Sequence, residues 1–229
     1  MGMLPIYVIN PNSSVEVTDR IAWAAREAWS GAEPEVRAVT LHEGPPGIIT
    51  EQHIREVTPL MSAFVQDNGP RASAFVIACF SDPGMFAARA VTVKPVIGIG
   101  EAGLAEARTH SQKIGVVAIS SGAKERHFDY YRQLGFGDVV CGENAINLTP
   151  LQSGDETLAY GRIITAATAL RDEDGAGVIV LGCAGMSQLR ARVEADIGIP
   201  VVDPCAAAVR AAVRAVVAQV SPPGVRAAS

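Results

Sequence analysis

The 229-residue sequence contains few aromatic residues and no run of charge of one sign. Phe, Trp and Tyr make up 5% of the chain, whereas 48% is hydrophobic and rich in Ala, Val, Ile and Gly. This composition favours buried parallel strands and small-residue helices over an aromatic-rich all-β fold. The 24 acidic and 19 basic residues give a net charge of −5 without a basic stripe. We therefore expect a compact α/β protein that does not bind nucleic acid.

The motifs of several common cofactor sites are missing. The sequence has no GxxxxGK(S/T), HExxH or CxxC, and its GxGxxG at 98–103 begins inside the predicted strand at 94–100 rather than after it. We accordingly expect no dinucleotide, nucleoside triphosphate or metal site, and no cofactor. The start of the chain has no basic segment and reaches polar residues after a few apolar ones, so it predicts neither a signal peptide nor a membrane anchor. We assign the protein to the cytoplasm, without a membrane partner.

Cysteine is scarce, and its spacing is irregular. Cys79, Cys141, Cys183 and Cys205 lie in or beside apolar segments, without the short regular spacings of a disulfide framework or a zinc site. We expect four reduced thiols. A single Cys at the end of an apolar strand is usually a small buried hydrophobe, and we interpret Cys141 and Cys205 in this way.

Short segments rich in Val and Ile alternate with helical patterns along the chain, which is typical of an α/β fold. Strands are predicted at 4–9, 35–41, 74–80, 94–100, 114–120, 138–142, 177–183 and 200–203. Helices are predicted at about 14–30, 51–67, 84–92, 101–111, 122–134, 155–172, 185–195 and 204–218. Ser13, Ser14 and Asp203 are candidate helix caps.

The order of elements is repeated in the two halves of the chain. A strand, a polar turn, a helix, a strand, a helix and a Cys-bearing strand follow one another twice. Polar turns begin near Asn10 and Ser120, and Cys79 and Cys183 follow 69 and 63 residues later. Each of these cysteines ends a strand, before a Gly-containing turn into a helix. Because ligands bind at the carboxyl ends of parallel strands, both thiols are expected at a cleft.

The repeat predicts two pseudosymmetric flavodoxin-like or Rossmann-like domains with parallel sheets and an active-site cleft between them. An axis that relates the halves places the two thiols on opposite sides of a bound molecule. The last helix, after Asp203, is expected to cross back onto the first half. We therefore predict a first domain from residues 1–98 plus 203–229, and a second from residues 99–202.

Two opposed thiols are suited to racemisation by proton transfer. One group must remove a proton from one face of a carbon, and another must deliver a proton to the opposite face. A free thiol has a pKa of about 8.5, which a helix N-terminus or amide donors lower. We predict Cys79 and Cys183 as the catalytic pair, one a thiolate and the other a thiol, with turns that bring a thiol pKa toward neutrality.

Removing a proton next to a carbonyl places negative charge on its oxygen, which needs donors aimed at it. The polar turns at the strand ends supply such groups. The candidate substrate-binding residues are Asn10, Asn12, Ser13, Phe80, Ser81, Ser120, Ser121, Ala184 and Gly185. Helix capping remains an equal alternative for Asn10 and Ser13.

Other polar residues receive structural interpretations. Asp82, before Pro-Gly, is predicted as a turn residue rather than an acid/base helper. Glu101 fits the first turn of a helix. The loop at 44–47, Gly-Pro-Pro-Gly, either shapes the cleft or simply connects two elements. The histidines are interpreted as surface or structural residues: His42, His53, His110 and His127.

The strings INPNSS, ACFSDPG and LGCAGM resemble the aspartate/glutamate/hydantoin racemase superfamily, and within it the hydantoin and allantoin racemases, over about residues 4–215. The resemblance implies two pseudosymmetric α/β domains and cofactor-independent catalysis by paired cysteines. In it, Cys79 and Cys183 match the catalytic pair and Asn10 matches the first substrate-binding loop. Arylmalonate decarboxylases keep only the second cysteine of the pair, so Cys79 argues against their chemistry.

The residues after each cysteine separate the relatives. Glutamate and aspartate racemases usually read CNT and CTH, whereas this chain reads CFS and CAG. We therefore expect a racemase that inverts the carbon next to a carbonyl in 5-substituted hydantoins or allantoin. The alternatives are an amino-acid racemase of the aspartate/glutamate type and a non-catalytic module that binds a small molecule. A homo-oligomer is expected, as for many small α/β enzymes.

Overall fold

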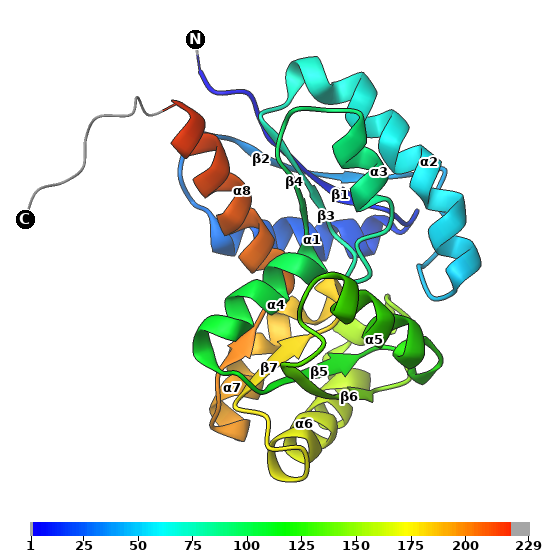
Figure 1. Ribbon diagram of the computed structural model, residues 1–229, viewed down its shortest axis with the longest axis vertical. Helices are drawn as coiled ribbons and strands as arrows, with labels where there is room; N and C mark the ends of the chain where they lie inside the picture. Colours follow the sequence, from blue (N-terminus) through cyan, green and yellow to red (C-terminus); the bar gives the residue numbers. More distant parts are fainter. Residues whose placement is uncertain (1, 221–229) are drawn as a thin grey trace, which may run out of the picture.

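The computed structural model describes residues 2–220, which form two four-stranded sheets in which all strand pairs are parallel (Figure 1). The first sheet has the order β2-β1-β3-β4, and the second has the order β6-β5-β7-β8. The strands are β1 (Ile6–Asn10), β2 (Val36–Thr40), β3 (Ala74–Ile77), β4 (Val96–Gly98), β5 (Ile114–Ala118), β6 (Val140–Ala145), β7 (Val178–Leu181) and β8 (Val201–Val202). The same strand order in both halves confirms the predicted α/β fold with two related sheets.

Helices cover both faces of each sheet. They are α1 (Val15–Ala28), α2 (Glu51–Asn68), α3 (Met85–Ala90), α4 (Ile99–His110), α5 (Lys124–Gln133), α6 (Glu156–Asp172), α7 (Arg190–Ile197) and α8 (Pro204–Val220). In the first sheet, α1 and α8 share one core with β1 and β3, whereas α2 and α3 pack on the opposite face. In the second sheet, α4 and α5 pack on one face and α6 and α7 on the other.

The helix caps agree largely with the sequence pattern. Ser14 caps α1, since its hydroxyl accepts a hydrogen bond from the amide of Val17. Asp203 caps α8 by accepting from the amides of Cys205 and Ala206. Ser13 is not a cap, because Ser14 occupies that position. These caps satisfy amides that the first helical turn leaves without a partner.

The prediction of an α-helix at 185–195 was wrong for the first half of that range. Residues Ala184–Leu189 form a 3-10 helix, and α-helical geometry begins only at Arg190. The Cys183 sulfur accepts a hydrogen bond from the Gly185 amide at 3.4 Å, and the Met186 amide then donates to the Cys183 carbonyl. The chain turns tightly around Cys183, and this tight turn takes the place of a regular first α-helical turn.

The last helix returns to the first half of the chain. Cys205, Ala208 and Ala212 of α8 belong to the same hydrophobic core as Ile6 and Val76 of the first sheet. The division into residues 1–98 plus 203–229 and residues 99–202 stays a prediction, and its final residues, 221–229, lie outside the described residues. Among the described residues, no helix is both long enough and apolar enough to cross a membrane.

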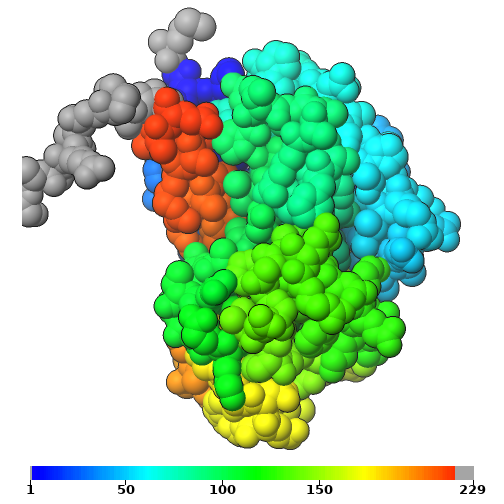
Figure 2. Space-filling model, viewed as in Figure 1, coloured from blue at the N-terminus to red at the C-terminus, as the bar shows by residue number. Residues whose placement is uncertain are grey.

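Helices α4 and α8 touch where the two halves join. A Cβ atom on Gly103 would lie 2.7 Å from the Cβ atom of Pro204, closer than real Cβ atoms pack. Further along, the Arg210 guanidinium binds the Glu106 carboxylate at 2.6 Å. In Figure 2 the second half, coloured green to yellow, lies directly against the cyan and teal surface of the first half. The glycine contact therefore fixes how closely these helices approach at the junction.

Candidate active site

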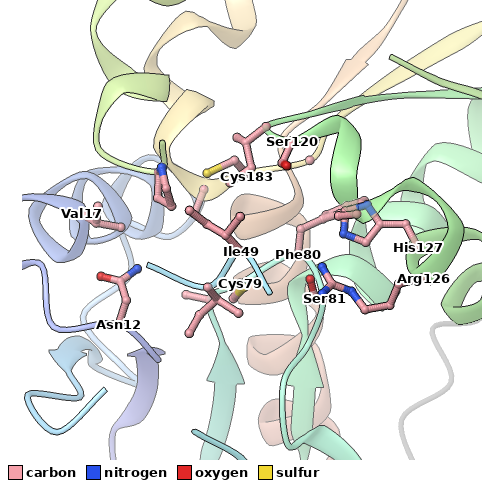
Figure 3. A pocket seen from close by; sticks show the side chains of 17 residues that line it. Asn12, Val17, Ile49, Cys79, Phe80, Ser81, Ser120, Arg126, His127 and Cys183 are labelled. Atoms are coloured by element: carbon pink, nitrogen blue, oxygen red, sulfur yellow. The ribbon is translucent and has the colours of Figure 1, made fainter. Parts of the chain in front are cut away.

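The carboxyl ends of β3, β5 and β7 and the turn after β1 surround a cavity of about 40 Å³ (Figure 3). Cys79 follows β3 and Cys183 follows β7, the equivalent strand of the other sheet, and both line this cavity. Figure 3 shows the side chain of Ile49 between the two cysteines in that view. The structure thus brings together the two cysteines that the repeat had paired, one from each sheet.

Five further predicted residues lie in the wall of the same cavity: Asn12, Phe80, Ser81, Ser120 and Ala184. They come from turns that follow four different strands, as the repeat predicted. Their polar groups surround a largely apolar space, a lining typical of small-molecule sites, but its volume is well below the roughly 300–1,000 Å³ of most such sites.

The remaining four predicted binding residues do not line the cavity. The amide of Asn10 is fully buried and donates hydrogen bonds to the Asn12 side chain, the Ser14 carbonyl and Thr18. The backbone amide of Ser13 donates a hydrogen bond to the Pro45 carbonyl. The backbone amides of Ser121 and Gly185 donate to the Asn147 side chain and the Cys183 sulfur, respectively. Asn10 therefore holds the turn that presents Asn12, because its own side chain is fully engaged in the turn.

Each cysteine has hydrogen-bond donors, yet burial dominates its acidity. Burial raises the pKa of Cys79 to about 12, although the Ser81 backbone and the charge of Arg126 act in the opposite direction. Burial also raises the pKa of Cys183, against the Ser153 hydroxyl and the Gly185 amide, each 3.4 Å from its sulfur. The prediction that the turns bring a thiol pKa toward neutrality is wrong for this cavity, because desolvation outweighs the donors.

Asp82 lies in the loop after Cys79 and connects it to the second half of the chain. Its backbone has a φ of 44°, in the left-handed region. Its buried carboxylate accepts hydrogen bonds from the amides of Gly100 and Glu101, at 2.9 and 2.8 Å, and from the Tyr130 hydroxyl at 2.7 Å. Burial raises the pKa of Asp82 to about 7. The turn role is supported, and the carboxylate also joins α4 and α5 to this turn.

His127 is a buried structural histidine, as one of the two interpretations has it, and it also lies in the cavity wall. It packs edge-on against the ring of Phe80. Its Nδ1 atom lies 3.0 Å from the buried Glu143 carboxylate of β6, which also accepts a hydrogen bond from the Tyr131 hydroxyl. The spacing of His127 and Tyr131, four residues apart on one helix face, was the available signal. Their shared partner, Glu143, lies on another element.

Arg126 is a further residue of the site that was not predicted from the sequence. This residue lies in the first turn of α5, after the turn that follows β5, and lines the cysteine cavity. It also lines a second cavity of about 460 Å³ between α2, α3 and α5, and the two cavities share Ser81, Arg126 and His127. A single arginine within a polar helix carries no sequence pattern that separates it from surface arginines.

The loop at 44–47 does not line the cavity itself, but it packs against the turn after β1, which does. A Cβ atom on Gly44 would lie 2.2 Å from the Pro11 carbonyl oxygen, so the loop rests closely on the turn after β1. The residues that follow the loop, Ile48 and Ile49, reach the cavity wall. Position 47 faces Pro150 of the other half. Within residues 2–220, no group of three or more His, Cys, Asp or Glu side chains is arranged to hold a metal ion.

Known proteins are similar to this chain in both sequence and fold. The sequence model of the Asp/Glu/Hydantoin racemase family matches residues 6–212. The chain belongs to this family. It is 32% identical to the hydantoin racemase of Paenarthrobacter aurescens over 216 residues, which cover 90% of this chain and 89% of that protein.

Two solved structures have the same arrangement of elements. Allantoin racemase from Klebsiella pneumoniae superposes with a TM-score of 0.86 and 28% identity, over 95% of this chain and 89% of that one. Allantoin racemase from Pseudomonas fluorescens superposes with a TM-score of 0.87 and 25% identity, over 97% of this chain and 95% of that one. The chain is thus a hydantoin/allantoin racemase-like member of its family, and membership implies an isomerase acting on a small molecule.

Proposed function

We propose that this protein is a cofactor-independent racemase that inverts the carbon next to a carbonyl in 5-substituted hydantoins or allantoin. The observation that carries the proposal is the position of Cys79 and Cys183, at the ends of equivalent strands and in the wall of one cavity. The hydantoin and allantoin racemases that it resembles support this choice of substrate class. The sequences CFS and CAG after the strands, in place of CNT and CTH, favour it over a free amino acid.

The mechanism uses one thiolate and one thiol. Cys183 has both a hydroxyl and an amide near its sulfur, so it is the better prepared to carry negative charge. In one direction its thiolate removes the proton from one face of the carbon, and the Cys79 thiol delivers a proton to the other face. The roles exchange in the reverse direction. Because burial raises both thiol pKa values, we expect deprotonation to accompany substrate binding and the polar contacts that it brings.

Replacing each cysteine separately tests this proposal. Cys79→Ser and Cys183→Ser are each expected to abolish racemisation of enantiopure 5-substituted hydantoins and allantoin, followed by polarimetry with a reducing agent present. Each variant is expected to exchange the carbon-bound proton with deuterium for one enantiomer only, because only one base remains. Cys141→Ser is the matched control, since Cys141 lies outside the cavity lining.

Other results would contradict the proposal. Full activity in either serine variant rules out the two-cysteine mechanism. Faster racemisation of L-aspartate or L-glutamate than of any hydantoin would establish an amino-acid racemase. Tight binding without any deuterium exchange in the wild-type protein would establish a binding module.

A further inference from the structure

Arg126 has a buried donor that finds no partner within the protein. Its Nε atom is enclosed and makes no hydrogen bond in the part of the chain that the structure describes. Leaving a charged donor buried and unpaired costs free energy, so native structures normally satisfy it. Since the side chain lines the cysteine cavity, a bound molecule is the natural source of the missing acceptor.

The carboxylates around Arg126 are engaged elsewhere. Asp82 accepts three hydrogen bonds from α4 and α5. Glu143 is held by a histidine and a tyrosine. Asp129, one turn further along α5, pairs with Arg132 at the surface. The guanidinium of Arg126 is therefore available to an acceptor in the cavity.

The position of Arg126 points to the Cys79 side of the site. Figure 3 shows its guanidinium extending toward Ser81, the second residue after Cys79. Its charge lowers the pKa of Cys79, against the larger effect of burial. Arg126 therefore places a cation in the wall of the cavity that Cys79 also lines.

We propose that Arg126 donates a hydrogen bond to the substrate oxygen that becomes negatively charged during racemisation. The inference rests on the proposed function. When one thiolate takes the proton, the C–H bond breaks, and its electron pair moves into the C–C bond while the C=O electrons move onto oxygen. Arg126 stabilises this enolate. When the opposite thiol returns a proton to the carbon, the C=O bond re-forms and that cysteine becomes the thiolate, so atoms and charge balance.

A negative oxygen could arise from two sources, and kinetics separates them. In a hydantoin the charge develops only during proton transfer, so loss of Arg126 lowers kcat with little change in KM. In a free amino acid the carboxylate is already charged in the bound substrate, so the loss raises KM. The CFS and CAG sequences favour the first source.

The test compares Arg126→Met with Arg132→Met on the same helix, using a 5-substituted hydantoin that the wild-type protein racemises. Removing one such donor typically lowers kcat by about 10²–10³-fold. We expect this loss for Arg126→Met, an intermediate loss for Arg126→Lys, and wild-type kinetics for Arg132→Met. Added guanidinium ions are expected to restore part of the activity of Arg126→Ala, which a purely structural role would not allow.

The outcomes divide clearly. Unchanged kcat in folded Arg126→Met overturns the inference, as does an increase in KM alone. If circular dichroism shows that Arg126→Met does not fold, Arg126→Lys and the guanidinium rescue test the role of Arg126 instead. Full activity of the lysine variant, or absence of rescue, then overturns the inference. A wild-type protein that racemises no hydantoin or allantoin refutes the proposed function instead.

Discussion

The two cysteines differ in what surrounds their sulfur atoms. Cys79 has the Ser81 backbone and the charge of Arg126, whereas Cys183 has a hydroxyl and an amide 3.4 Å from its sulfur. In a low-dielectric cavity these contacts decide which sulfur carries charge more easily, because burial penalises both. Ser153, a residue that no sequence pattern singled out, lies beside the Cys183 sulfur on η3 (Gln152–Gly154). Its hydroxyl donates to the Pro150 carbonyl at 2.8 Å and can turn to the sulfur, 3.4 Å away, when the thiolate forms.

Replacing Ser153 with Ala tests this support. The change removes a hydroxyl 3.4 Å from the Cys183 sulfur, so the pKa of Cys183 is expected to rise further. A single hydrogen bond contributes about 0.5–1.5 kcal/mol, so the thiolate fraction at a given pH should fall by up to about tenfold. The measurement is the rate of iodoacetamide alkylation of Cys183 against pH, resolved by mass spectrometry, with Cys141 in the same sample as the control. An unchanged Cys183 profile would show that the hydroxyl does not stabilise the thiolate.

At the scale of elements, one carboxylate joins three parts of the chain. Asp82 connects the turn after β3, the N-terminus of α4 and the hydroxyl of Tyr130 on α5. Gly98 and Gly100 lie close to this carboxylate. A Cβ atom would be 2.3 Å from the Oδ2 atom of Asp82 at position 98 and 3.0 Å from it at position 100. The Cys79 turn is therefore held to the second half through one titratable group.

Asp82 gives stability a specific pH dependence. Its pKa is about 7 in the folded protein and ~3.9 in an unfolded chain, so the folded state holds the proton more tightly. The stabilisation that this provides is complete below about pH 4 and is lost as the pH rises toward 7. Asp82→Asn cannot titrate, so we expect the difference in unfolding free energy, wild type minus variant, to fall between pH 4 and 7. Urea unfolding at several pH values measures it, and a constant difference would contradict the prediction.

The secondary structure was largely predictable because local signals agreed. Strands rich in Val and Ile were bounded by Gly, Pro and polar turns, and Ser14 and Asp203 marked helix starts. The tight turn after Cys183 was not, since small residues such as Ala184 and Gly185 fit several backbone geometries. Its shape depends on the sulfur–amide contact.

At the scale of the whole molecule, the site was only partly predictable. The internal repeat predicted that Cys79 and Cys183 lie at one cleft, because the carboxyl ends of parallel strands meet at one edge of a sheet. His127 and Arg126 escaped because their importance depends on α5 packing across β6 and against the first half. That packing joins residues far apart in the chain, and no local pattern encodes it. A homo-oligomer stays a prediction, as do the domain boundaries.

The spacing of the two halves depends on a close contact between α4 and α8. Because a Cβ on Gly103 would lie 2.7 Å from Pro204, Gly103→Ala must push these helices apart, and overpacking of this kind costs about 1–3 kcal/mol. Gly161 of α6 has nothing within 4 Å of the same position, so Gly161→Ala should instead stabilise the helix by about 0.5–1 kcal/mol. Thermal unfolding is expected to shift in opposite directions. Since the cysteines follow strands of different sheets, Gly103→Ala should also slow racemisation, while Gly161→Ala leaves its rate unchanged. Equal racemisation rates in the two variants would show that the α4–α8 contact does not set the cysteine geometry.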